Sequence, residues 1–194
     1  MSAGAGAART VDGLTVPPAG RWVFEAGNSE ITFSVKHLVI SKVRGSFKQF
    51  SGEILVAEEF WASSASASIR SDSVDTGLAA RDKDLRGPDF LDAESHPTLE
   101  FRSTGLSASG DGWTLTGDLT VAGQTRPVWL AVEFAGVATD PWGNVKAVFS
   151  ATTKLNREEF GLTYNKVIEG GGVLIGSDIT IEIEIQAKRG QERV

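Results

Sequence analysis

The sequence predicts an all-β protein: one domain, built as an eight-stranded antiparallel up-and-down β-barrel. About eight segments alternate apolar and polar residues with a period of two, and turn signals separate nearly all of them. No long amphipathic helix interrupts the series, which argues against a parallel α/β sheet. Several segments are about 10 residues long, and this length favours tilted barrel strands over the shorter strands of a sandwich.

The first strands follow a stretch of unusual composition. Residues 1–20 are rich in Ala and Gly and then in Pro, so we expect a mostly disordered N-terminal tail. The alternation then begins, with Ile31, Phe33 and Val35 on one face of a strand. Further strands are expected over residues 44–56 and over Ser64–Arg70.

A connection without alternation comes next, over residues 73–97. Thr76 is placed to cap a short helix that runs through Leu85, with Asp82 and Arg86 paired four residues apart. The segment therefore predicts a short helical crossover near residues 76–92. Long connections in β proteins are usually functional or cover an opening.

The remaining strands follow in series. Asp111-Gly112 is a strong hairpin signal, and the strand after it alternates from Trp113 to Val121. The last strand has the clearest pattern, with isoleucine at 179, 181, 183 and 185. The barrel is expected to cover residues 21–188, followed by a C-terminal tail over residues 189–194.

Composition excludes several classes of function. The 194 residues carry a net charge of −6, which disfavours nucleic acid and electrostatic docking on anionic headgroups. There is no cysteine, so no disulfide and no thiolate metal site can form. No secretion signal and no run of about 18 apolar residues is visible, so we expect a cytoplasmic protein without a transmembrane segment. A periplasmic or secreted location follows instead if a signal was removed.

The barrel interior decides between two classes of function. Eight strands enclose either packed side chains or one ligand. Small residues on otherwise bulky strands favour open space; they are Ala65, Ala67, Gly117, Ala147 and Ala151. A tall, narrow, apolar space fits a long apolar chain, because each buried CH₂ contributes about 0.8 kcal/mol.

Six landmarks then match a known family in the right order. The opening strand is 28–37 (NSEITFSVKH), and the second contains Gly45-Ser46-Phe47. The crossover carries 81–85 (RDKDL) and His96-Pro97; the remaining landmarks are the hairpin 117–128 and the loop 156–162 (NREEFGL). The chain resembles the YceI-like, polyisoprenoid-binding, lipocalin-like proteins over about residues 21–188. The resemblance implies an extended eight-stranded barrel with a long isoprenoid, quinone or similar lipid in its core.

Some candidate residues allow two interpretations. His37 is in phase with the inward face and is either a donor to a lipid head group or a structural histidine. Arg81 either contacts the head group or pairs with a carboxylate that holds the crossover. Asn156 and Arg157 either meet the ligand at the mouth or cap the loop. The acidic residues of 82–96 match no metal-binding spacing, so a solvated helix face is the better interpretation.

The expected function is binding, storage or transport of a long apolar lipid, without catalysis and without a cofactor or metal. The candidate ligand-binding residues are Phe33, Val35, His37, Phe47, Ile69, Arg81, Asp82, Phe90, Phe101, Leu119, Phe149, Asn156, Phe160 and Leu162. One alternative is a packed, ligand-free interaction module with exposed Trp113, Trp129 or Trp142, with a homodimer through a strand edge as a further option. The other alternative, an enzyme on a small apolar substrate, has no nucleophile elbow, phosphate loop or zinc signature in its favour.

Overall fold

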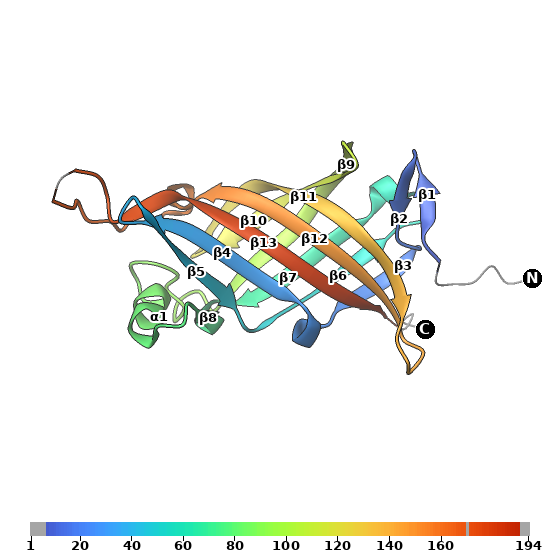
Figure 1. Cartoon of the computed structure of the whole chain (residues 1–194), viewed down its shortest axis with the longest axis horizontal. Coiled ribbons are helices and arrows are strands. Elements are labelled where there is room, and N and C mark those ends of the chain that lie inside the picture. The colour runs from blue at the N-terminus through green and yellow to red at the C-terminus, as the bar shows by residue number, and fades with distance from the viewer. Residues whose placement is uncertain (1–6, 170, 191–194) are drawn as a thin grey trace, which may run out of the picture.

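A computed structural model describes residues 7–169 and 171–190 and shows an elongated β-barrel with one short α-helix at one end (Figure 1). The strands are β1 (Arg9–Val11), β2 (Leu14–Val16), β3 (Gly20–Phe24), β4 (Glu30–His37), β5 (Ser41–Phe47), β6 (Phe50–Val56), β7 (Ser64–Arg70), β8 (Val74–Asp75), β9 (Thr98–Ser109), β10 (Gly112–Val121), β11 (Gln124–Thr139), β12 (Val145–Asn156) and β13 (Ile175–Arg189). The helices are α1 (Ala79–Arg86) and the 3-10 turns η1 (Ala26–Asn28), η2 (Phe60–Ala62), η3 (Ser71–Ser73) and η4 (Arg157–Phe160).

The barrel is closed and has eight strands, because β3/β4, β5/β6 and β7/β8 are each one interrupted strand. Neighbours along the chain pair antiparallel, and β13 completes the circle. It pairs with β12 on one side and with both β3 and β4 on the other. The predicted up-and-down barrel is confirmed.

The breaks in the strands were not expected. The predicted single strand over residues 44–56 is wrong in detail, since it splits at Lys48 and Gln49. Those two residues turn their backbone toward the third strand, where Lys48 N–H donates to Ser73 O and Gln49 O accepts from Arg70 N–H. The alternation continues on both sides of this break, so the pattern alone does not reveal it.

The crossover is helical as predicted, but its internal contacts differ. α1 begins at Ala79, three residues after Thr76, and no side chain caps it. The expected Asp82–Arg86 pair does not form. Asp82 accepts from Thr76, and Arg86 donates to the carbonyl of Val74 at 3.0 Å.

The predicted N-terminal tail is wrong for residues 9–20. β1 and β2 form a hairpin around Asp12-Gly13, and the chain then runs inward at Val16, which has no exposed surface. Arg9 holds this hairpin in place by donating to the carbonyls of Ala57 and Glu58. Residues 1–6 lie outside the described part of the chain. The β1–β2 hairpin lies at the end of the barrel opposite α1 and covers it (Figure 1).

The predicted C-terminal boundary is also slightly early, since β13 extends through Arg189. Residues 191–194 lie outside the described residues.

An aromatic cluster packs the interior near the covered end. Phe60 meets Trp113 edge to face at 4.8 Å between ring centroids, and Phe134 joins Trp113 to Phe149. Trp113, expected among exposed aromatics, is 6% exposed, whereas Trp129 and Trp142 are indeed on the surface at 60% and 83%. Trp113 is the second residue of β10, and the phase of this strand turns it inward.

Candidate functional site

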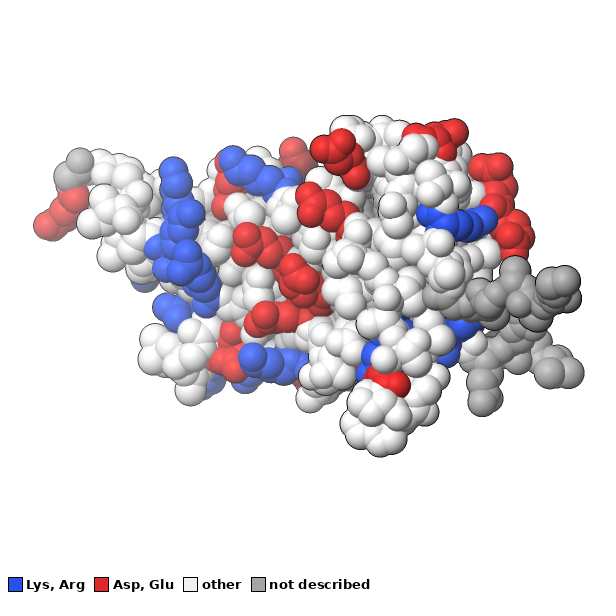
Figure 2. All heavy atoms as spheres, turned by 45° about the vertical axis from the view of Figure 1, so that its right-hand side comes forward, with Lys and Arg blue, Asp and Glu red and all other residues white. Residues whose placement is uncertain are grey.

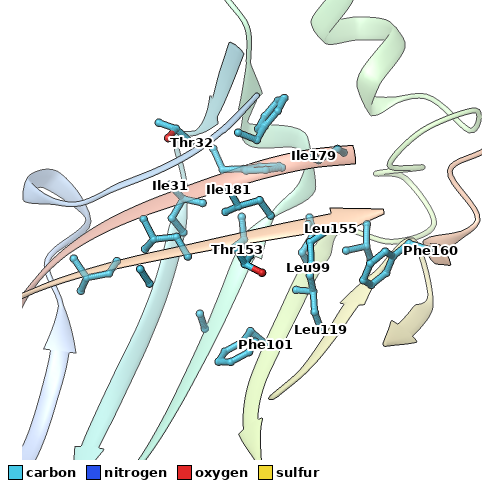
Figure 3. Close-up of a pocket in the computed structure, with 18 of the residues that line it drawn as sticks. Ile31, Thr32, Leu99, Phe101, Leu119, Thr153, Leu155, Phe160, Ile179 and Ile181 are labelled. Carbon is cyan, nitrogen blue, oxygen red and sulfur yellow. The ribbon is translucent and has the colours of Figure 1, made fainter. Parts of the chain in front are cut away.

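The barrel encloses a cavity of about 490 Å³. Its lining is almost entirely apolar and comes from all eight barrel strands. The four isoleucines predicted to share one face of β13 all line it. Figure 3 shows the side chains from β9, β12 and β13 around the same space; they are Leu99, Phe101, Thr153, Leu155, Ile179 and Ile181.

Glycines on neighbouring strands make room for phenyl rings at the cavity wall. A Cβ atom on Gly45 would lie 2.5 Å from Cζ of Phe33, its cross-strand partner. A Cβ atom on Gly117 would lie equally close to the ring of Phe101. Each ring thus lies against the wall, over a position without a side chain, and the middle of the barrel stays open.

The predicted small residues partly account for this space. Ala65, Ala67 and Ala151 line the cavity, Gly117 lies beneath a ring as described, and Ala147 is buried elsewhere in the wall.

The charged and ionisable lining residues gather at the α1 end of the cavity. His37 ends β4, Arg81 and Asp84 belong to α1, and Arg157 begins η4. Asp84 is also exposed to solvent, so the cavity reaches the surface beside α1. We call this end the mouth.

Asp82 fixes the conformation of the crossover through hydrogen bonds from Thr76. Burial raises the pKa of its carboxyl, but hydrogen bonds from Thr76 N–H at 2.8 Å and Thr76 Oγ1 at 2.6 Å outweigh burial. The positive charges of Arg86 and Arg81 add to this, and the pKa ends below its ordinary value. Arg81 donates to Oγ1 and to the carbonyl oxygen of the same Thr76. The two predicted crossover residues are therefore linked through Thr76.

Arg157 is the most deeply buried cation of the cavity wall, with 3% of its surface exposed. Its guanidinium donates to the carbonyls of Leu162, Ile175 and Gly176, the last at 2.8 Å. Burial lowers the pKa of this guanidinium. Its acceptors within the described part of the chain are backbone carbonyls, so Arg157 ties η4 and the following loop to the start of β13. These contacts fit the loop role, one of the two roles that the sequence left open for Arg157, although Arg157 also lines the cavity.

Most sequence-predicted site residues meet in this cavity. Every candidate lines it except Asp82 and Asn156. Asp82 faces Thr76 as described, and Asn156 accepts from Glu158 N–H as the cap of η4. The structure adds lining residues that sequence reasoning did not select, among them Leu99, Trp113, Leu115 and the β13 isoleucines. Their alternation was visible in the sequence, and extending the inward phase along each strand would have found them.

His37 lines the cavity near the mouth, and Ser41 Oγ donates to its backbone carbonyl at 2.7 Å. Among residues 7–169 and 171–190, no group of three His, Asp or Glu side chains is placed to hold a metal ion. No helix in the same part of the chain is long and apolar enough to cross a membrane.

Comparison with known proteins agrees with this geometry. The family model described as the YceI-like domain matches residues 22–187. A UPF0312 protein of Ectopseudomonas mendocina (strain ymp) is 41% identical over 135 residues, which cover 69% of this chain and 71% of the relative.

Two solved structures illustrate the shared fold. A YCEI protein of Campylobacter jejuni is 31% identical with a TM-score of 0.68, covering 80% of this chain and 90% of that one. A polyisoprenoid binding domain from Saccharophagus degradans is 12% identical with a TM-score of 0.62, covering 89% and 99%. The family model covers most of the chain and the curated relative is 41% identical to it, so the chain belongs to the YceI-like domain family.

Proposed function

We propose that this protein binds a long apolar lipid, such as a polyisoprenoid or an isoprenoid quinone, and stores or transports it. The observation that supports this most is the cavity: about 490 Å³, apolar along its length, and open beside α1. Ligand-binding cavities in proteins have volumes of roughly 300–1,000 Å³.

The energetics favour a chain-like ligand. Each CH₂ moved from water into the cavity contributes about 0.8 kcal/mol, so one isoprene unit of about five carbons contributes about 4 kcal/mol. A chain of a few units then binds well with few polar contacts. The phenyl rings against the wall at Gly45 and Gly117 leave the length of the barrel free for such a chain.

The polar end of the lipid is proposed to lie at the mouth. The charged and ionisable lining residues are all at this end, and Arg81 and His37 carry donors suited to phosphate or carbonyl oxygens. The opposite end is lined by groups such as Pro17 and Phe60. An isoprenoid tail directed toward Phe60 with its head beside Arg81 matches this polarity.

Relatives support the same class of ligand. The Saccharophagus degradans neighbour is described as a polyisoprenoid binding domain. Binding without conversion is part of the proposal, and Arg157, the most deeply buried cation of the wall, donates to three backbone carbonyls.

Native mass spectrometry tests the proposal, on protein purified from its own host and followed by organic extraction of any bound mass. We expect an adduct that extracts as a long-chain isoprenoid or quinone. Apo protein is then titrated with a polyprenyl lipid, which is expected to raise the melting temperature by mass action. An apo mass together with an unchanged melting temperature across a panel of prenyl lipids would reject the proposal.

A further inference from the structure

The turn between β4 and β5 exposes three consecutive aliphatic residues. Leu38, Val39 and Ile40 are 45%, 59% and 93% exposed, and we call them the hairpin tip. A second loop lies against the tip: Leu38 N–H donates to Leu174 O at 2.9 Å, and this loop exposes Val167 at 84%. Contiguous exposed aliphatic surface of this kind marks an interaction site.

The backbone of the tip is unfavourable for the residues it carries. Leu38 and Val39 have φ angles of +52° and +66°. Short hairpin turns with positive φ strongly prefer Asn and Gly, and a β-branched residue there is strained. The side chains at this turn are therefore not explained by the needs of the turn.

Lys and Arg side chains lie on β4 and β5, the two strands that the tip connects. Residues 31–52 contain four Lys or Arg and no Asp or Glu. Lys36 and Lys42 are direct cross-strand partners, both exposed, although like charges facing each other destabilise a sheet. Arg44 is exposed next to them on β5, and neither it nor the two lysines forms an ion pair within residues 7–169 and 171–190. Figure 2 shows Lys and Arg side chains gathered in a band just behind the left-hand end of the molecule.

The tip is at the rim of the cavity. His37, immediately before the tip, and Leu174, which is bonded to it, both line the cavity. β4 and β5 reach the same end of the barrel as α1 (Figure 1). Whatever the tip contacts therefore lies next to the opening.

We propose that the hairpin tip inserts into the surface of a bilayer containing anionic phospholipids, with Lys36, Lys42 and Arg44 on the phosphate groups. Exposed aliphatic side chains together with neighbouring cations favour peripheral binding to an anionic membrane surface. The net charge of −6 predicts weak attraction to such a surface, but residues 31–52, which contain the tip and the three cations, carry no Asp or Glu. Exposed carboxylates at this end of the barrel lie on other segments, at Asp84 of α1 and at Glu169 of the second loop. Docking in this orientation places the mouth against the membrane. The inference goes beyond the proposed ligand binding and concerns where the lipid enters and leaves.

Co-sedimentation of the full chain with phosphatidylcholine vesicles, with and without phosphatidylglycerol, tests the docking. We expect binding that needs phosphatidylglycerol and weakens with salt. Ile40→Asp is expected to abolish it, whereas Leu55→Asp, at a residue 45% exposed near the other end, leaves it unchanged. Lys42→Glu is expected to weaken binding about 20-fold or more, since each cation contributes about fivefold and its sign is reversed. Lys188→Glu makes the same charge change near the covered end and is the matched control.

A double variant separates docking from folding. Leu38→Asn with Val39→Gly supplies the residues that the turn prefers, so its melting temperature should rise while vesicle binding is lost. Native mass spectrometry of the same variants distinguishes this inference from ligand binding, because Ile40→Asp should still hold a lipid. Wild-type protein that carries lipid but does not sediment with anionic vesicles would overturn the docking alone. Tip-dependent dimers in light scattering without vesicle binding would overturn it in favour of a second copy.

Discussion

Ala151→Phe is the substitution that most directly separates an open barrel from a packed one. Ala151 lies on β12, between its cross-strand partners Val132 and Ile183, and all three line the cavity. A phenyl ring at this position extends into the middle of the space that the lipid is proposed to fill.

The structure sets opposite signs for stability and binding. Burying a Phe side chain in open apolar space contributes about 1.5–3 kcal/mol, which raises the melting temperature of the apo protein by about 3–12 °C. The same ring occupies the room of about one isoprene unit and so removes about 4 kcal/mol of lipid binding. This corresponds to a loss of affinity of up to about a thousandfold.

Two measurements on the same samples are needed. Thermal unfolding of delipidated protein gives the stability, and quenching of the cavity-lining Trp113 by an isoprenoid quinone gives the affinity. Ala131→Phe adds the same ring to the exposed outer face and is the control for both.

A packed interior would respond differently. Overpacking costs about 1–3 kcal/mol, so the Ala151→Phe apo protein would melt at a lower temperature. A lower melting temperature, or quinone affinity equal to that of wild type, would refute the reasoning from the cavity.

Three further predictions concern the wall, the crossover and the covered end. Gly45→Ala places a Cβ 2.5 Å from Cζ of Phe33 and 2.8 Å from Cγ2 of Thr76, so the ring must turn inward. Thermal melts should show that the free energy of unfolding falls by about 1–3 kcal/mol and that added lipid raises the melting temperature less than in wild type. Equal melts for both proteins would contradict this. Because the pKa of Asp82 is lowered, its contribution to stability is present at pH above the ordinary carboxyl pKa and is lost as the pH falls through the lowered pKa. Asp82→Asn should therefore reduce the fall of the melting temperature in acid. Parallel pH profiles of melting temperature for wild type and variant would contradict this. Val16→Ala should cost on the order of 2 kcal/mol and lower the melting temperature by about 4–8 °C, whereas no change would mean that the β1–β2 segment does not cover the barrel in solution.

The barrel itself was predictable because its signal is local. The alternation in β13 predicts which isoleucines face inward, and the inward residues of the other strands can be predicted in the same way. The cavity-lining candidates on strands were predicted for this reason, and their convergence required only that the barrel close.

The errors arose where residues outside an element decide its contacts. Asp82 and Arg86 are correctly spaced for a helical pair, yet Thr76, outside the helix, supplies the hydrogen bonds that Asp82 accepts. The β1–β2 hairpin is short, and its Asp12-Gly13 turn signal is preceded by residues of low complexity. Its order depends on Arg9 reaching the carbonyls after β6, a contact that no local pattern records.

The double pairing of β13 has a consequence for how the chain folds. β13 meets both β12 and the first barrel strand, β3/β4, so the circle stays open until β13 itself has left the ribosome. A large loop must close in that final step, which makes such topologies slow to fold. Until then the inward isoleucines of β13 are not enclosed by the opposite wall of the barrel. An apolar chain present at that moment would meet an open sheet rather than a narrow mouth. For the proposed lipid, loading during biogenesis and loading of the finished barrel would thus be two kinetically separate routes.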